Sequence, residues 1–165
     1  MKKIIPLIIV LVISFVFVPE ASAAKTEQWE LIYNGGQGSG NCTLNKGQNG
    51  TLTADGNWTY NYEGANVSGP YSNAPVTIAG ASISITASGT ATNPSAPPGY
   101  QTSPFTSSTS GKAHDGHGSG TFTITFSNPV WPSSISGTWT GTRKSGSGIT
   151  AISAIPWIQM LLLND

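Results

Sequence analysis

The sequence predicts an all-β protein: a single antiparallel meander domain that closes into a small barrel, with a two-sheet sandwich as the alternative. Two observations predict this class. In several short runs apolar residues alternate with serine or threonine, as in strands that bury one face. Turn sequences such as Asn34-Gly35-Gly36, Asn49-Gly50 and Asp115-Gly116 separate these runs, and no long linker divides the chain.

Residues 1–23 are predicted to form a cleaved secretory signal peptide, with an uncleaved membrane anchor as the alternative. Lys2 and Lys3 precede an apolar stretch, 4–18, and small residues at 21–23 form a cleavage sequence. The mature chain, 24–165, is then one exported β domain, periplasmic or extracellular. We expect no transmembrane segment in it, because hydroxyl-rich strand faces do not suit lipid.

The composition narrows the possible partners. Only 8% of the 165 residues are charged and the net charge is zero, whereas a typical domain has about 25% charged residues. The basic residues after the leader are scattered, so we expect no nucleic-acid partner. The five tryptophans favour a packed core over disorder.

Cys42 is the single cysteine, so an intramolecular disulfide is excluded. We expect a small apolar side chain on a strand, with a disulfide-linked dimer or a reactive thiol as alternatives. Asn41, Asn49, Asn57 and Asn66 begin N-x-S/T triplets, which the abundance of these residue types explains.

The segment around Trp58 supplies the candidate ligand-binding residues. A three-residue loop, 55–57, is predicted to pair Leu52 with Tyr60 in a hairpin. Trp58, Tyr60 and Tyr62 then share one strand face, and such an aromatic strip can stack on sugar rings or line a barrel pocket. Core packing is the alternative. Thr59 and Asn61 lie on the opposite, solvent face.

The later part of the chain continues the alternation over 82–88, 121–126 and 135–142. The stretch 93–111 contains four prolines and is predicted to be a long surface loop over one barrel mouth or sheet edge. The apolar stretch 149–163 is too short for a membrane span. Its first part, 149–155, is expected to form the closing strand.

Threonine recurs at every second position over 121–125 and again over 138–142. These rows resemble the hydroxyl arrays of ice-binding proteins. They follow no fixed sequence period, however, and threonine is common in strands for its conformational preference alone.

Catalytic chemistry has little support. His114 and His117 lie beside Asp115, but a zinc site needs three or four ligands. A glycine-rich turn between two strands, Gly116-His117-Gly118, is therefore the expected structure, and a metal-dependent enzyme is the alternative. No nucleophile with a base and no paired carboxylates are apparent. We therefore assign no catalytic residue, metal or cofactor and expect a non-enzyme.

These observations predict an exported, non-catalytic β-protein that acts as a binding or surface-structural module. The alternative is a carbohydrate or small-ligand binding protein that uses the aromatic strip. The partner is unknown, with a carbohydrate or another protein as possibilities.

Overall fold

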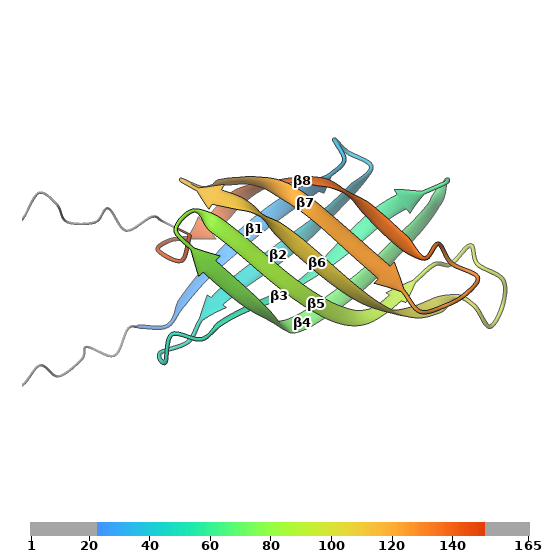
Figure 1. The fold of residues 1–165 in the computed structure, drawn as a ribbon, viewed down its shortest axis with the longest axis horizontal. Helices are drawn as coiled ribbons and strands as arrows, with labels where there is room; N and C mark the ends of the chain where they lie inside the picture. The colour runs from blue at the N-terminus through green and yellow to red at the C-terminus, as the bar shows by residue number, and fades with distance from the viewer. Residues whose placement is uncertain (1–22, 151–165) are drawn as a thin grey trace, which may run out of the picture.

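The computed structural model describes residues 23–150, which form one closed antiparallel barrel (Figure 1). Each strand pairs with its neighbours in the sequence, and β8 pairs with β1 to close the sheet. The meander barrel predicted from the sequence is confirmed, and the sandwich is not what forms. The strands are β1 (Lys25–Tyr33), β2 (Gly38–Lys46), β3 (Leu52–Tyr62), β4 (Ala65–Ala79), β5 (Ser82–Thr92), β6 (Thr102–His114), β7 (His117–Phe126) and β8 (Ser134–Gly146).

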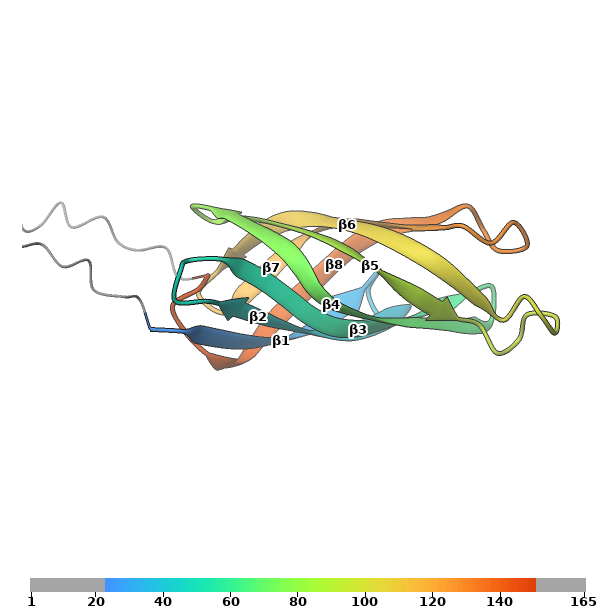
Figure 2. The same cartoon turned by 90° about the horizontal axis from the view of Figure 1, so that it is seen from below.

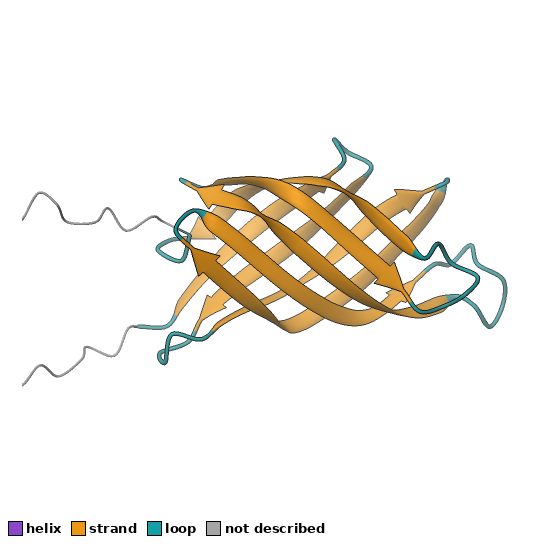
Figure 3. Cartoon of the chain, in the orientation of Figure 1, coloured by secondary structure: helices purple, strands orange, loops and turns teal. Residues whose placement is uncertain are grey.

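The alternation of residue types explains these strands. In β5, Ile83, Ala87 and Ala91 are buried, while the serines and threonines between them are exposed. A period of two places each kind of side chain on one side of the wall. Figure 3 shows that strands and loops make up the whole described chain; accordingly, residues 23–150 contain no helix that could cross a membrane.

The two ends of the barrel differ (Figures 1 and 2). The described chain begins and ends at one end, which we call the termini end. The other end carries the connections 34–37, 63–64, 93–101 and 127–133, and we call it the loop end. The longest connections, 93–101 and 127–133, project together at the right of both views.

Aromatic side chains fill the lumen. The ring of Trp58 meets Phe105 edge-on, with centroids 5.3 Å apart, and Phe122 lies between Tyr33 and Tyr60 at 4.9 and 6.0 Å. These separations are typical of favourable edge-to-face pairs. The core is therefore a packed interior and not an open channel.

The predicted hairpin loop at 55–57 is wrong. Residues 55–57 lie within β3, which pairs with β2 without interruption. Position 56 has no room for a side chain. A Cβ there would meet the carbonyl oxygen of Asn41 and would lie 2.6 Å from the Tyr71 hydroxyl. The pairing with β4 shifts register between Ala54 and Gly56, so the glycine marks a bulge.

The predicted loop 93–111 is too long. The irregular connection covers 93–101, and β6 begins at Thr102. Pro104 is tolerated because it precedes the first pair of the β6–β7 ladder, Phe105 with Phe126, so it sits near the end of the strand. Its carbonyl accepts a hydrogen bond from the amide of Ser127.

Strand β8 closes the barrel by pairing with β1, so the prediction that 149–155 forms the closing strand is wrong. Of that segment, Ile149 and Thr150 are buried but lie outside any strand, and 151–155 fall outside the described residues. The predicted signal peptide also falls outside them, except for its last residue, Ala23.

Candidate functional site

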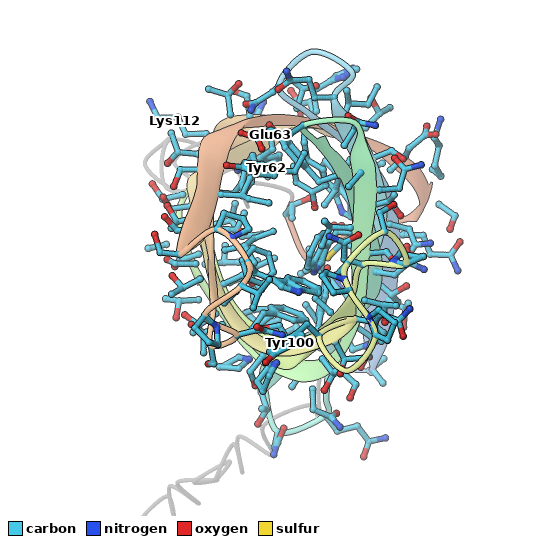
Figure 4. All side chains as sticks on the ribbon, turned by 90° about the vertical axis from the view of Figure 1, so that its right-hand side faces the viewer. Tyr62, Glu63, Tyr100 and Lys112 are labelled. Atoms are coloured by element: carbon cyan, nitrogen blue, oxygen red, sulfur yellow. The ribbon has the colours of Figure 1, made fainter. Side chains whose placement is uncertain are left out.

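The predicted aromatic strip points into the barrel. Trp58 and Tyr60 are only 3% and 6% exposed, while Tyr62 at the loop end is partly exposed. Figure 4 looks into that end and places Tyr62 and Tyr100 on opposite sides of it. The shared strand face is confirmed, and Thr59 and Asn61 are on the solvent face as predicted. Any binding role of the strip stays a prediction.

The lumen leaves little space beside this strip. One hollow of about 30 Å³ lies among Trp29, Leu44 and Trp139, and another of about 30 Å³ among Trp58, Tyr71 and other inward residues. Ligand pockets are typically about 300–1,000 Å³, so each hollow suits one or two water molecules rather than a sugar ring. The buried indole N–H of Trp58 has no hydrogen-bond partner among the described residues.

A larger hollow lies on the outer wall. It measures about 560 Å³, runs over β2, and is bordered by β1, β3 and the end of β8. We call it the β2 groove. Its outward-facing residues carry amide, hydroxyl or charged groups: Gln28, Glu30, Ser39, Asn41, Thr43, Asn57, Thr59 and Lys144.

Strand register explains how this groove forms. Glu30, Asn41 and Asn57 are direct partners across β1, β2 and β3, so they lie side by side in one row. The outward side chains of β2 on either side of Asn41, those of Ser39 and Thr43, are short. The longer side chains of Gln28 and Glu30 on β1 and of Lys144 on β8 border the groove on one side, and β2 forms its floor.

The charges in the β2 groove balance. The ammonium of Lys144 lies 2.5 Å from a carboxylate oxygen of Glu30, and both side chains are more than half exposed. An exposed pair of this kind contributes at most about 1 kcal/mol to stability. The hydrogen-bonding positions that Glu30 and Lys144 do not use on each other stay open to a ligand. Since these are the charged residues that line the groove, it carries no net charge.

Two neighbouring hollows extend the groove. One of about 340 Å³ shares Ser39 and Thr59 with it and reaches Ile32 and Asn66. Another of about 270 Å³ shares Asn57 and Thr59 and reaches Pro70 on β4. Ile32 is 44% exposed and supplies an apolar patch on this mostly polar surface.

The outer wall of β5–β8 has a different chemistry. Serine and threonine occupy almost every outward position and align across the strands, as in the row Thr86, Ser108, Thr123 and Ser136. Neighbouring hydroxyls pair directly, for example Thr123 with Ser136 at 3.0 Å. We call this surface the hydroxyl wall. The two predicted threonine rows thus become parts of one array, with Lys112 pointing outward near its edge (Figure 4).

The two histidines lie at the β6–β7 turn. His114 and His117 are direct cross-strand partners, and His114 Nδ1 lies 2.9 Å from a carboxylate oxygen of Asp115. The tight turn consists of Asp115 and Gly116, which both have positive φ. The predicted turn at 116–118 is therefore displaced, because His117 and Gly118 already belong to β7. Within residues 23–150 no group of three His, Cys, Asp or Glu side chains could hold a metal ion.

The connections 93–101 and 127–133 at the loop end are joined by hydrogen bonds. The indole of Trp131 donates to the carbonyl of Tyr100 at 2.7 Å, and the side-chain amide of Asn128 donates to the carbonyls of Tyr100 and Thr102. Trp131 is buried against Phe126. The connection 93–101 therefore lies at the loop end of the barrel, where these hydrogen bonds hold it to the connection 127–133.

Sequence reasoning also missed Glu27, the one buried carboxylate among the described residues. It accepts hydrogen bonds from the backbone amides of Ile149 and Thr150, from the Thr150 hydroxyl, from the Trp29 indole and from Arg143. Burial acts to raise the pKa of Glu27, but the hydrogen bonds from Ile149, Thr150 and Trp29 together outweigh burial and lower it. Glu27 thereby joins β1, β8 and the segment that follows β8.

Comparison of the chain with protein-family models, curated proteins and solved structures gives no match. The residues themselves must therefore carry any functional argument.

Proposed function

We propose that the protein is an exported, non-catalytic binding module that recognises its target on the outer wall of the barrel. The observation that supports this proposal is the difference in volume between the hollows inside the barrel and the groove on its outer wall. Hollows among the inward side chains measure about 30 Å³, whereas the β2 groove measures about 560 Å³. A target of more than a few atoms fits the outside.

The groups in the β2 groove suit recognition better than catalysis. Amides and hydroxyls such as those of Asn41, Asn57 and Thr59 donate and accept hydrogen bonds without gaining or losing protons near neutral pH. The carboxylate of Glu30 is held by Lys144 and has no second carboxylate beside it in the groove. Hydrogen-bonded recognition of a polar ligand is the activity that this set of groups supports.

A thermal-shift screen of the purified exported chain tests the proposal. The panel contains neutral oligosaccharides, peptides and lipophilic small molecules, since a ligand that binds only the folded state raises the Tm. We expect a shift from one polar class, abolished by Thr59→Lys in the β2 groove and retained in Thr123→Lys on the hydroxyl wall. A shift that comes from lipophilic compounds and survives Thr59→Lys would instead favour the lumen and contradict the proposal.

A further inference from the structure

We infer that the β2 groove binds a linear, uncharged oligosaccharide that lies along β2 and hydrogen-bonds to the amides of Asn41 and Asn57. This inference rests on the proposed function and specifies its ligand.

The amide groups give the chemical complementarity. An asparagine side chain presents a donor and an acceptor next to each other, which matches two neighbouring hydroxyls of a sugar ring. Asn41 and Asn57 are cross-strand partners, so their Cβ atoms lie about 5 Å apart on the same face. Both side chains are exposed, and Ser39 and Thr59 form the next row toward the loop end.

The shape favours a chain of sugars over a single ring. The groove and its two neighbouring hollows share the outward-facing residues Ser39, Asn57 and Thr59, so they adjoin on the outer wall and together form the depression that the ligand would occupy. Its floor follows β2 and the adjoining turn from Thr43 to Gln37, and at about 3.3 Å per residue this distance is about 20 Å. The depression lies open on the side of the barrel, so an internal segment of a polysaccharide can enter it.

The charges favour a neutral ligand. Lys144 is paired with Glu30, so the groove holds no free cation for a phosphate or a uronic acid. Ile32, 44% exposed, offers an apolar contact for the C–H face of a ring.

An extended peptide is a less suitable occupant. Peptides that bind along strands do so by pairing with a sheet edge, and a closed barrel has no free edge. The outward side chains of the groove would have to supply every contact. A ligand whose own hydroxyls meet those side chains fits better.

Isothermal titration calorimetry of the purified exported chain with neutral trisaccharides to hexasaccharides of glucose, xylose, mannose and N-acetylglucosamine tests the inference. We expect binding that strengthens with chain length. Asn41→Ala and Asn57→Ala should each weaken it about five- to tenfold, because each removes about one net hydrogen bond. The matched control Thr123→Ala on the hydroxyl wall should retain wild-type affinity. Amide chemical-shift changes on titration should map to β1–β3.

The outcomes separate the inference from the proposed function. If no neutral oligosaccharide binds but another class binds in a manner sensitive to Thr59→Lys, the inference fails and the proposed function stands. If oligosaccharides bind equally well to both asparagine variants, the groove is not their site and the inference also fails. Far-ultraviolet circular dichroism verifies folding, and Asn41→Asp, which keeps the side-chain size, replaces Asn41→Ala if that variant does not fold.

Discussion

Replacing Glu27 by glutamine should destabilise the barrel more than any other single change to a charged side chain among residues 23–150. The Glu27 carboxylate is fully buried, and Arg143 lies 3.2 Å from it. The Thr150 hydroxyl donates to it at 2.8 Å and the amide of Ile149 at 2.9 Å. In Glu27→Gln the new NH₂ group faces these donors, and Arg143 loses its counter-charge.

The magnitude follows from known costs of such changes. Removing one partner of a buried ion pair costs about 3–5 kcal/mol. Glutamine keeps one acceptor oxygen and the side-chain volume, so we expect the lower value, about 3 kcal/mol. For a domain of this size each kcal/mol lowers the Tm by about 3 °C, so the Tm should fall by about 10 °C.

The pH dependence gives a second measure of the same group. The pKa of Glu27 in the folded state lies below its ordinary value of 4.5. The carboxylate's contribution is therefore fully present above about pH 4.5 and is lost as the pH falls through the folded-state pKa. The difference in stability between wild type and Glu27→Gln should be largest at neutral pH and should shrink in acid.

Differential scanning calorimetry between pH 3 and 7 measures both effects, and Glu30→Gln is the matched control. Glu30 is exposed and paired with Lys144, so its loss should cost less than about 1 kcal/mol. A Glu27→Gln protein that melts within about 2 °C of wild type at neutral pH would refute the role assigned to this carboxylate.

Three further changes test the interior and the loop end. Burial raises the pKa of the Cys42 thiol to about 11. A thiol reagent at pH 8 should therefore modify Cys42 far more slowly in the native protein than in guanidinium chloride, and equal rates would contradict this burial. Gly56→Ala should cost about 2–4 kcal/mol in chemical denaturation, because the new Cβ meets the backbone carbonyl oxygen of Asn41 and the Tyr71 hydroxyl. An unchanged midpoint would argue against β3 as described. Asn34 has positive φ, and its side chain donates to Tyr60 and accepts from the amide of Thr138. Asn34→Gly keeps the backbone conformation and should still lose about 2 kcal/mol, and full stability in that variant would show that these hydrogen bonds contribute little.

The architecture was predictable because one face of each strand is buried. The period of two over 82–88, 121–126 and 135–142 is local, and it fixes which residues face the lumen. The error at 55–57 has a long-range cause. A glycine beside an aspartate is typical of a turn, but Gly56 is required by the close approach of Asn41 on β2 and Tyr71 on β4, which local sequence does not reveal.

The candidate site was less predictable than the fold. Glu30, Asn41 and Asn57 are separated in the sequence and meet only through the register of three strands. Outward polar residues look alike in a sequence whether they line a groove or a convex wall. The aromatic strip was predicted as a binding site because tryptophan and tyrosine are typical of ligand contacts. In the structure Trp58 and Tyr60 are buried, since the lumen of a small barrel is filled by large side chains.

The separation of the two sides of the wall makes the proposed site testable without disturbing the fold. Inward residues such as Cys42 and Trp58 are buried in the core, whereas their neighbours Asn41 and Thr59 project from the same strands into solvent. Substitutions at exposed strand positions usually change stability by less than about 0.5 kcal/mol. The hydroxyl wall lies on β5–β8, whereas the β2 groove lies on β1–β3 and reaches β8 only at Lys144. Each groove variant on β2 or β3 therefore has a control of similar exposure on the same molecule. A loss of binding confined to groove variants therefore reports recognition by this surface and not damage to the core.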